Sequence, residues 1–232
     1  MKVSNRLQEK YDYHANDKTN DMYGHFDILS DVASNCEHVT ELGVRGICSS
    51  WAFLKGMASM ANRFVTVTPE ERTKLYMISA KLLVSIDHIH PNDFGGNLEE
   101  FEEIAKENDV NTKFIKSSSL EIELDETQLI FFDTDHNYEQ LKRELALHGN
   151  KSTRYLVFHD TTRFAKELIP AINEFLEDTD EWIVIHQTNE CQGLVVLGRF
   201  SIDYFNSMQK NNIDAEQSRT LRPEYEDHPD VE

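Results

Sequence analysis

The sequence predicts an α/β fold with a mostly parallel sheet covered by helices on both faces. Two observations lead to this prediction. The spacing of apolar residues alternates along the chain between the pattern of strands and that of helices, and three strand-like runs end on an aspartate. Strands that alternate with helices form parallel sheets with a helical layer on each side. The chain has 232 residues, 39% hydrophobic and 10% aromatic, which suffices for the core of one such domain.

The first half of the chain alternates between the two patterns at short intervals. Apolar residues recur every three or four positions in three segments, and helices are therefore expected over 22–35, 49–62 and 97–109. Shorter apolar runs predict strands over 38–44, 81–87 and 112–118. Asn97 stands where it can cap the third helix.

The second half gives clearer signals. Strands are expected over 128–133, 153–160, 181–188 and 193–200, and helices over 137–149 and 165–178. The four residues NECQ separate the last two strands, which indicates a hairpin. Gly149 is placed as the left-handed residue that ends a helix, and Pro170 implies a kink or an early turn in the last helix.

Composition narrows the partners and the compartment. The chain carries 42 Asp and Glu against 23 Lys and Arg, a net charge of -19, and such a surface repels phosphate backbones and anionic membranes. The first residues lack the apolar stretch of a signal peptide, and no run approaches the roughly 20 apolar residues of a membrane span. The three cysteines have neither disulfide nor metal-site spacing. We therefore expect a cytoplasmic protein without nucleic-acid or membrane partners.

The aspartates at strand ends mark the expected ligand-binding edge. Asp87, Asp133 and Asp160 each follow an apolar run directly, and ligands of open α/β sheets bind outside the carboxyl ends of the strands. The turn ELGVRG (41–46) joins another strand to a helix at this edge. Glycines allow a backbone to approach a ligand closely because they lack a Cβ atom. Taken alone, this turn fits a ligand-binding loop and an ordinary strand-to-helix connection equally well.

The segments around these residues resemble class I S-adenosylmethionine-dependent methyltransferases, in the branch of the cephalosporin-hydroxylase-like and the sugar or macrolide O-methyltransferases. The resemblance covers roughly residues 22–200 in family order, through ELGVRGICSSWAFLKG, VSIDHIHP, IKSSS, LIFFDTDHNYEQLKRELALH, YLVFHDT and IPAINEFLEDTDEWIVIHQTNECQGLVVLGR. It implies a Rossmann-like three-layer sandwich whose seven-stranded sheet ends in an antiparallel hairpin. It also implies methyl transfer to a hydroxyl of a sugar or small natural product.

The resemblance further implies a cofactor site for S-adenosylmethionine. Glu41 and Gly43 would line the methionine end of the cofactor. Ser49 and Ser50 would lie near its carboxylate at a helix start, where free N–H groups favour an anion.

At the other end of the cofactor, Asp87 would accept hydrogen bonds from the ribose hydroxyls, and Ser118 or Ser119 would lie near the adenine. The chain between Gly43 and Asp87 is longer than is usual in the family, so residues 62–80 are interpreted as an insertion in a domain spanning 1–204. Residues 205–232 form a polar, acidic tail with the composition of a disordered segment.

The catalytic residues implied by the resemblance lie in its two most specific blocks, DTDHNYEQLKREL and FHDT. Asp133 and Asp160 would end neighbouring strands about 4.8 Å apart, where two carboxylates repel unless they share a proton or a cation. Asp133, His159 and Asp160 would hold a divalent metal, magnesium or manganese. His136 would be the general base, because imidazole titrates near neutrality. Asp135 would orient His136 or bind a substrate hydroxyl.

Two departures from the family pattern leave other functions open. Ile47 stands where the family often has a further glycine, and His159 stands at a position that is commonly acidic. A Rossmann-like module that binds without turnover therefore remains an alternative, as does another nucleotide-cofactor enzyme such as an NAD-dependent one.

Other assignments also stay open at this stage. A second register would make RFVTVT (63–68) the second strand and Glu70 or Glu71 the ribose acid. His88, His90 and Asp93 could bind a metal, although a solvated loop is the simpler interpretation. The motifs do not identify the methyl acceptor, and a homo-oligomer is compatible with the sequence.

Overall fold

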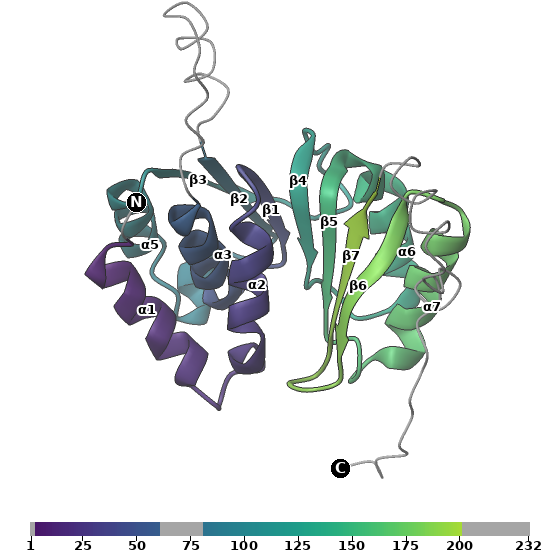
Figure 1. The fold of residues 1–232 in the computed structure, drawn as a ribbon, viewed down its shortest axis with the longest axis horizontal. Helices are drawn as coiled ribbons and strands as arrows, with labels where there is room; N and C mark the ends of the chain where they lie inside the picture. The colour runs from purple at the N-terminus through teal and green to yellow at the C-terminus, as the bar shows by residue number, and fades with distance from the viewer. Residues whose placement is uncertain (1–2, 61–80, 201–232) are drawn as a thin grey trace, which may run out of the picture.

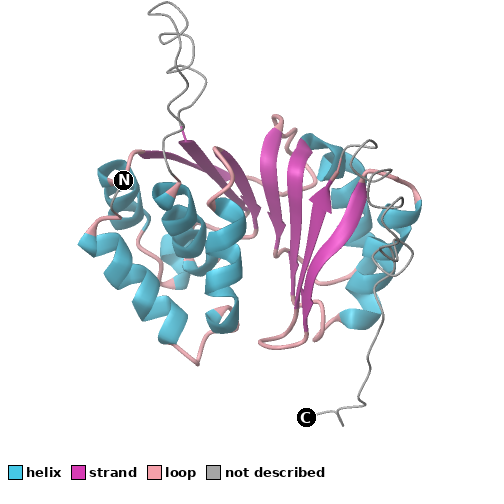
Figure 2. Ribbon diagram, in the orientation of Figure 1, coloured by secondary structure: helices cyan, strands magenta, loops and turns pink. Residues whose placement is uncertain are grey.

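The computed structural model describes residues 3–60 and 81–200, which form a three-layer α/β sandwich around a seven-stranded sheet (Figure 1, Figure 2). The strands lie in the order β3-β2-β1-β4-β5-β7-β6. The neighbours from β3 to β5 pair in parallel, whereas β7 runs antiparallel to both β5 and β6. The predicted fold class is confirmed, and so is the antiparallel pair at the end of the sheet.

Each strand begins and ends within two residues of its predicted bounds. The strands are β1 (His38–Leu42), β2 (Lys81–Asp87), β3 (Val110–Lys116), β4 (Thr127–Phe132), β5 (Ser152–His159), β6 (Trp182–Thr188) and β7 (Leu194–Arg199). Because β2 pairs with β1 and ends on Asp87, the second strand has the register that the sequence favoured. The alternative strand 63–68, the insertion 62–80 and the tail 205–232 lie outside the described residues.

Helices cover both faces of the sheet. The described helices are α1 (Asn5–Asn16), α2 (Phe26–Ala33), α3 (Cys48–Ser59), α5 (Leu98–Glu107), α6 (Tyr138–His148) and α7 (Ala165–Glu177). Short 3₁₀ turns are η1 (Tyr23–His25), η2 (Pro91–Phe94) and η3 (Gly149–Lys151). Helices α1, α2, α3 and α5 pack on one face, and α6 and α7 pack on the other (Figure 1). No helix of residues 3–60 and 81–200 is long and apolar enough to cross a membrane.

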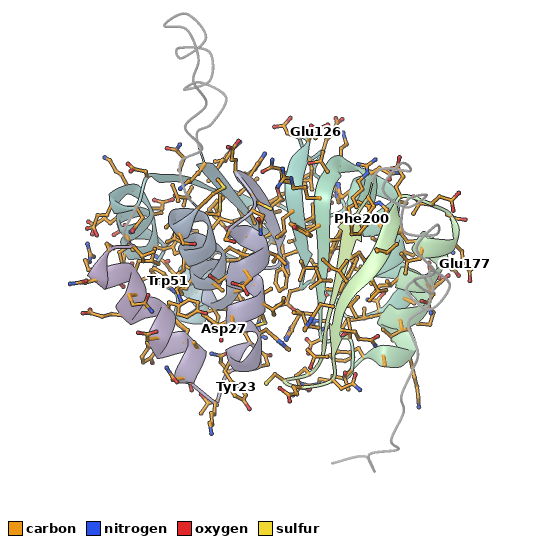
Figure 3. All side chains as sticks on the ribbon, viewed as in Figure 1. Tyr23, Asp27, Trp51, Glu126, Glu177 and Phe200 are labelled. Carbon is orange, nitrogen blue, oxygen red and sulfur yellow. The ribbon has the colours of Figure 1, made fainter. Side chains whose placement is uncertain are left out.

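Alternation along the central strands divides the core between the two faces. In β4, Leu129 and Phe131 join the cluster beneath α3, whereas Ile130 and Phe132 join the cluster beneath α6 and α7. Side chains fill the space on both sides of the sheet. Trp51, which is labelled in Figure 3, lies on the face that α1, α2, α3 and α5 cover. Strands buried on both faces explain the continuous apolar runs in the sequence.

Two local expectations need correction. Helix α1 was not predicted, because its sequence is polar and it buries only Leu7 and Tyr11. Gly149 is not a left-handed helix terminus: its φ is -52° and the chain continues into η3. The glycine is needed for packing instead, since a Cβ atom there would lie 2.7 Å from Phe175 Cε2.

The ends of the central strands are aligned by their pairing. Leu42 lies opposite both Ile86 and Phe132, and Phe132 lies opposite Phe158. The ladder continues one step further, because the Asp133 N–H donates to the Leu42 carbonyl at 2.9 Å. The segments that follow β1, β2, β4 and β5 therefore meet at one edge of the sheet, as parallel strands require.

Candidate active site

Four titratable side chains converge where β4 and β5 end. His136 Nε2 lies 2.8 Å from Asp160 Oδ2 and 3.3 Å from Asp133 Oδ1. His159 Nδ1 lies 3.2 Å from the same Asp133 oxygen and 3.6 Å from Asp160 Oδ2. The two carboxylates thus alternate with the two imidazoles, and all four residues predicted for metal binding and proton transfer are brought together.

The ends of two neighbouring strands, β4 and β5, hold three members of this cluster. Asp133 directly follows β4, His159 is the last residue of β5, and Asp160 follows in the left-handed region with φ +57°. Aspartate tolerates this conformation better than most residues. The ring of His136 stacks on Phe164, with centroids 4.6 Å apart and planes at 7°.

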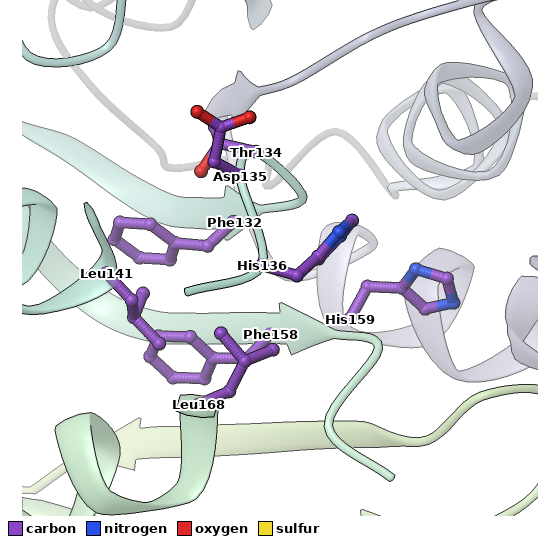
Figure 4. Close-up of a pocket in the computed structure, with 8 residues that line it drawn as sticks. All are labelled: Phe132, Thr134, Asp135, His136, Leu141, Phe158, His159 and Leu168. Atoms are coloured by element: carbon purple, nitrogen blue, oxygen red, sulfur yellow. The ribbon is translucent and has the colours of Figure 1, made fainter. Parts of the chain in front are cut away.

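The rings of His136 and His159 line a small pocket with an apolar floor (Figure 4). The floor consists of Phe132, Leu141, Phe158 and Leu168. The predicted orienting role of Asp135 is not supported: its side chain points away from both imidazoles in Figure 4 and is exposed. Asp133 and Asp160 hold His136 instead.

The electrostatics of the cluster follow from this alternation. Burial by itself would raise the pKa of Asp133, but hydrogen bonds from His136 and His159 outweigh it and hold that pKa well below its usual range. Burial would lower the pKa of His136, but the carboxylates of Asp133 and Asp160 raise it to about 9. Burial alone would also lower the pKa of His159, but the hydrogen bond and the charge of Asp133 raise it. The alternation of carboxylates and imidazoles thus favours the protonated form of both rings.

The same atoms suit a divalent cation. One ligand atom each from Asp133, His159 and Asp160 lies within 4.8 Å of the others. In the described part of the chain, Asp160 Oδ1 is buried and has no hydrogen-bond partner. Two carboxylates with one imidazole match the ligand preferences of manganese and related ions. The donor set therefore fits a metal ion, and the unpartnered oxygen is an observation that a ligand would explain.

The predicted cofactor loop lies beside this cluster, but its polar groups bond to one another. Glu41 is fully buried and accepts hydrogen bonds from the hydroxyls of Ser49, of Ser50 at 2.6 Å and of Ser85 at 3.4 Å. Burial, reinforced by the charge of Asp133, raises the pKa of Glu41 to about 7. The Ser49 and Ser50 hydroxyls thus face Glu41, while their residues form the first turn of α3.

Asp87 is also engaged within the protein. Its Oδ2 accepts from the N–H groups of Val44 at 2.8 Å and Arg45 at 3.0 Å, and its Oδ1 accepts from Ile89 N–H at 2.9 Å. This carboxylate therefore fixes the turn after β1 to the end of β2. It lies at the predicted strand end, and ribose binding by this residue stays a prediction.

Positive φ angles, which favour glycine, occur at three residues in and directly after the turn: Gly43, Arg45 and Ile47. Gly43 has φ +84°, and a Cβ atom there would lie 2.0 Å from the Asp133 carbonyl oxygen. Ile47 has φ +68°, although it carries a β-branched side chain that is 2% exposed. The backbone at Ile47 thus keeps the left-handed geometry that glycine adopts without cost.

Sequence reasoning missed a buried polar network beside the predicted adenine region. Glu144 is fully buried and accepts from Ser119 Oγ at 2.5 Å, Thr134 Oγ1 at 2.8 Å and Gln140 Nε2 at 2.8 Å. Ser118, the other predicted serine, accepts from the Leu120 N–H at 3.3 Å. A charged residue on the apolar face of α6 was the available signal.

Sequence reasoning also missed His25, which is fully buried in η1. Its Nε2 lies 2.9 Å from the Cys191 carbonyl oxygen, and its ring meets that of His159 edge to face. Burial lowers the pKa of His25 to about 4, so the ring is neutral. The sequence pattern assigned this residue only to a helix.

The histidines that follow β2 form no comparable cluster. His88 and Asp93 are exposed, and His90 Nδ1 accepts from the Asn92 N–H at 3.3 Å at the start of η2. Over the described ranges, the group of Asp133, His159 and Asp160 is the one arranged for a metal.

Several solved structures with a similar fold are described as methyltransferases. A methyltransferase from Geobacter sulfurreducens matches 87% of this chain and 92% of its own with 13% identity and a TM-score of 0.53. A SAH-bound methyltransferase from Podospora anserina matches 86% and 89% with 11% identity and a TM-score of 0.54. An O-methyltransferase from Bacillus cereus in complex with SAH matches 86% and 93% with 12% identity and a TM-score of 0.51.

These similarities establish a Rossmann-like methyltransferase fold. No protein-family model matches the chain, and no curated protein matches it. At identities this low, shared architecture does not transfer activity or ligands. Information on function therefore comes from the residues at the carboxyl edge of the sheet.

Proposed function

We propose that the protein is an S-adenosylmethionine-dependent, divalent-metal-assisted O-methyltransferase that acts on a hydroxyl of a sugar or small natural product. The observation that carries the proposal is the cluster of Asp133, His136, His159 and Asp160 at the carboxyl edge of a methyltransferase sheet. SAH in two neighbours of this fold supports the choice of cofactor. The net charge of -19 favours a small acceptor over a nucleic acid.

In this proposal the acceptor oxygen would attack the methyl carbon as the bond from that carbon to sulfur breaks. The hydroxyl proton would pass to Nδ1 of the neutral His136 ring, because its Nε2–H faces the carboxylates of Asp133 and Asp160. Glu41, Gly43, Ser49 and Ser50 would hold S-adenosylmethionine, which would supply the methyl group. Asp133, His159 and Asp160 would hold a divalent ion, whose positive charge would lower the pKa of the acceptor hydroxyl.

His136 can accept a proton only in its neutral form. Burial would lower its pKa, but the hydrogen bonds and charges of Asp133 and Asp160 raise it to about 9. Compensation of those charges is therefore a condition for base catalysis by this residue near neutral pH. Stacking on Phe164 fixes the plane of the ring, and a fixed base and acceptor account for much of the rate, because in-line methyl transfer depends on positioning.

The second candidate is a domain of the same fold that binds a ligand without turnover. Ile47 favours it, because a β-branched residue occupies a left-handed position in the turn where a cofactor would lie. The hydrogen bonds of Asp87 also favour this second candidate, because the backbone N–H groups of Val44, Arg45 and Ile89 already donate to both of its carboxylate oxygens.

Calorimetric titration with S-adenosylmethionine, alone and with Mg²⁺ or Mn²⁺, separates the two candidates. The proposal expects micromolar binding, about -8 kcal/mol, followed by time-dependent formation of S-adenosylhomocysteine with sugar or phenol acceptors. Binding without product across an acceptor panel favours the second candidate, and absence of binding in every metal condition contradicts the proposed cofactor. A nicotinamide absorbance assay on the same samples tests an NAD-dependent reaction.

A further inference from the structure

We propose that His25 is a positioning residue that fixes the hydrogen of His159 on Nε2 and so frees Nδ1 of His159 to bind the metal. The inference rests on the metal centre proposed above, and it concerns a residue far from that centre in the sequence. His25 belongs to η1 ahead of α2, whereas His159 ends β5.

The hydrogen-bond partner of His25 defines the state of its ring. Nε2 lies 2.9 Å from the Cys191 carbonyl oxygen, and a carbonyl oxygen only accepts. Nε2 therefore carries the single N–H of the neutral ring, and Nδ1 is left as an acceptor. The His25 ring meets that of His159 with centroids 5.4 Å apart and planes at 77°.

The facing rings contain two complementary atoms without partners. Within the described residues, His25 Nδ1 and His159 Nε2 are both buried and make no hydrogen bond. Buried polar atoms are nearly always paired, and here an acceptor and a donor stand on adjacent rings. A hydrogen bond from His159 Nε2–H to His25 Nδ1 would satisfy both atoms at once.

This pairing decides which nitrogen of His159 is available to a metal. A neutral imidazole has one N–H, and the nitrogen that binds a metal must be the other one. His159 Nδ1 faces Asp133 Oδ1 at 3.2 Å, so a hydrogen on Nδ1 would be held by that carboxylate. An acceptor at Nε2 shifts the hydrogen to the far side of the ring. Metal-bound histidines generally donate their other N–H to such an acceptor.

His25 is itself held by the turn between β6 and β7. The His25 ring bonds to the Cys191 carbonyl oxygen. Its chain neighbour Gly24 packs against the Cys191 side chain, since a Cβ atom on Gly24 would be 2.4 Å from Cys191 Sγ. The acceptor at His25 Nδ1 is therefore fixed from two sides, by η1 and by the hairpin turn. An acceptor held in this way can select one tautomer of His159.

Two substitutions separate the nitrogen from the shape of the ring. His25→Phe keeps an aromatic edge against His159 and removes the acceptor, so the dissociation constant for Mn²⁺ should rise by about 10- to 100-fold. His25→Asn offers an amide oxygen near the position of Nδ1, and its dissociation constant should return toward the wild-type value. S-adenosylmethionine affinity should stay unchanged in both variants.

His148 provides a matched control. It too bonds a backbone carbonyl through Nε2, at 2.7 Å from Ser119, and has a buried Nδ1 without a partner in the described region. His148→Phe should leave Mn²⁺ affinity unchanged, because this ring does not contact the cluster. Equal affinities in wild type and His25→Phe would overturn the inference while leaving the metal centre intact. Failure of wild type to bind Mn²⁺ would overturn both.

A measurement on the unmodified protein covers the case in which the variants do not fold. Long-range ¹H–¹⁵N spectra of histidine-labelled protein with Zn²⁺, a diamagnetic ion that imidazole binds, report the hydrogen on each ring nitrogen. We expect the hydrogen on Nε2 in both His25 and His159. A hydrogen on His25 Nδ1, or on His159 Nδ1 in the metal-loaded protein, would overturn the inference.

Discussion

The carboxyl edge of the sheet contains two acidic regions that differ in whether their polar atoms have partners. At the ends of β1 and β2, Glu41 accepts from three hydroxyls and Asp87 from three backbone N–H groups. At the ends of β4 and β5, Asp160 Oδ1 and His159 Nε2 are buried without partners among the residues described.

The difference separates a structural role from a binding role. Buried polar atoms that lack partners are costly. A ligand best explains Asp160 Oδ1, whereas the proposed pairing with His25 Nδ1 would satisfy His159 Nε2. The satisfied groups at β1 and β2 instead fix the loop between strand and helix. A cofactor would bind there through backbone groups, or by replacing existing hydrogen bonds.

The strongest test of the comparison removes a carboxylate from the unsatisfied region. Asp133→Asn should reduce metal-stimulated turnover on the order of a thousandfold, about 4 kcal/mol in the activation barrier, because the amide removes a charged ligand. S-adenosylmethionine affinity, measured by calorimetry, should change little. Asp135→Asn is the control, since that exposed carboxylate points away from the histidines (Figure 4). Unchanged turnover in Asp133→Asn would remove the metal from the mechanism.

Gly43 is the point at which the two regions touch, and a methyl group there should damage both. Gly43→Ala places a Cβ atom 2.0 Å from the Asp133 carbonyl oxygen at a φ of +84°. Overpacking together with the unfavourable φ should lower the free energy of unfolding by about 3 kcal/mol, and Mn²⁺ affinity should fall as Asp133 moves. Urea denaturation and metal titration measure the two effects.

Gly95 supplies the control for this substitution. Its φ is +80°, but a Cβ atom there meets nothing within 4 Å. Gly95→Ala should therefore cost only the conformational part, about 1 kcal/mol, and leave Mn²⁺ affinity unchanged. Equal losses in the two variants would show that contact with Asp133 does not matter.

The sheet could be predicted from the sequence because its central strands are buried on both faces and therefore appear as continuous apolar runs. Asp87 and Asp133 could be located in the same way, because each stands directly after such an apolar run and so marks the ligand-binding edge of the sheet. Helix α1 could not be predicted, since it buries only two side chains and leaves too weak a pattern. The role of Gly149 depends on Phe175, 26 positions away in the chain, and no local pattern reveals such a contact.

The residues of the candidate site likewise fall into two groups, those that local sequence patterns identify and those that only long-range contacts reveal. Asp133, His136, His159 and Asp160 could be identified because each follows or ends a strand or starts a helix in a recognisable block. His25 could not, because its importance comes from its contact with Cys191, which is distant in sequence. For Glu144 the sequence offered only a charge on an apolar helix face, and its contact with Ser119 is also distant in sequence. The bonds of Asp87 to Val44 and Arg45 were equally invisible, because backbone N–H groups carry no sequence signal.

The stability of the protein should depend on pH because the satisfied region contains the buried carboxyl group of Glu41. Burial holds the pKa of Glu41 at about 7, above its ordinary value of 4.5, so the folded state binds this proton more tightly than the unfolded state. The resulting stability is complete below about pH 4.5 and is lost as pH rises to about 7. Glu41→Gln should lack this loss, a difference of about 2–3 kcal/mol between pH 5 and pH 8.

Urea denaturation of wild type and Glu41→Gln at the two pH values measures this difference. Glu121→Gln is the control, because that side chain is exposed and should leave the pH dependence as in wild type. Parallel pH profiles for wild type and Glu41→Gln would mean that Glu41 is ionised in the folded state at pH 5.

The smallest expected effect is that of Ile47 substitutions on S-adenosylmethionine affinity, and it decides whether the satisfied region still admits a cofactor. Ile47→Ala and Ile47→Gly both remove a buried side chain, and each should destabilise the protein by roughly 2–4 kcal/mol. Because φ is +68°, the glycine variant should be the more stable of the two by about 1 kcal/mol, the reverse of the order in ordinary helical positions. If the cofactor binds beside this turn as proposed, Ile47→Gly should change S-adenosylmethionine affinity by less than about threefold, well under 1.4 kcal/mol. A tenfold or larger gain in affinity would show that the isoleucine obstructs the cofactor, and would favour the candidate that binds without turnover.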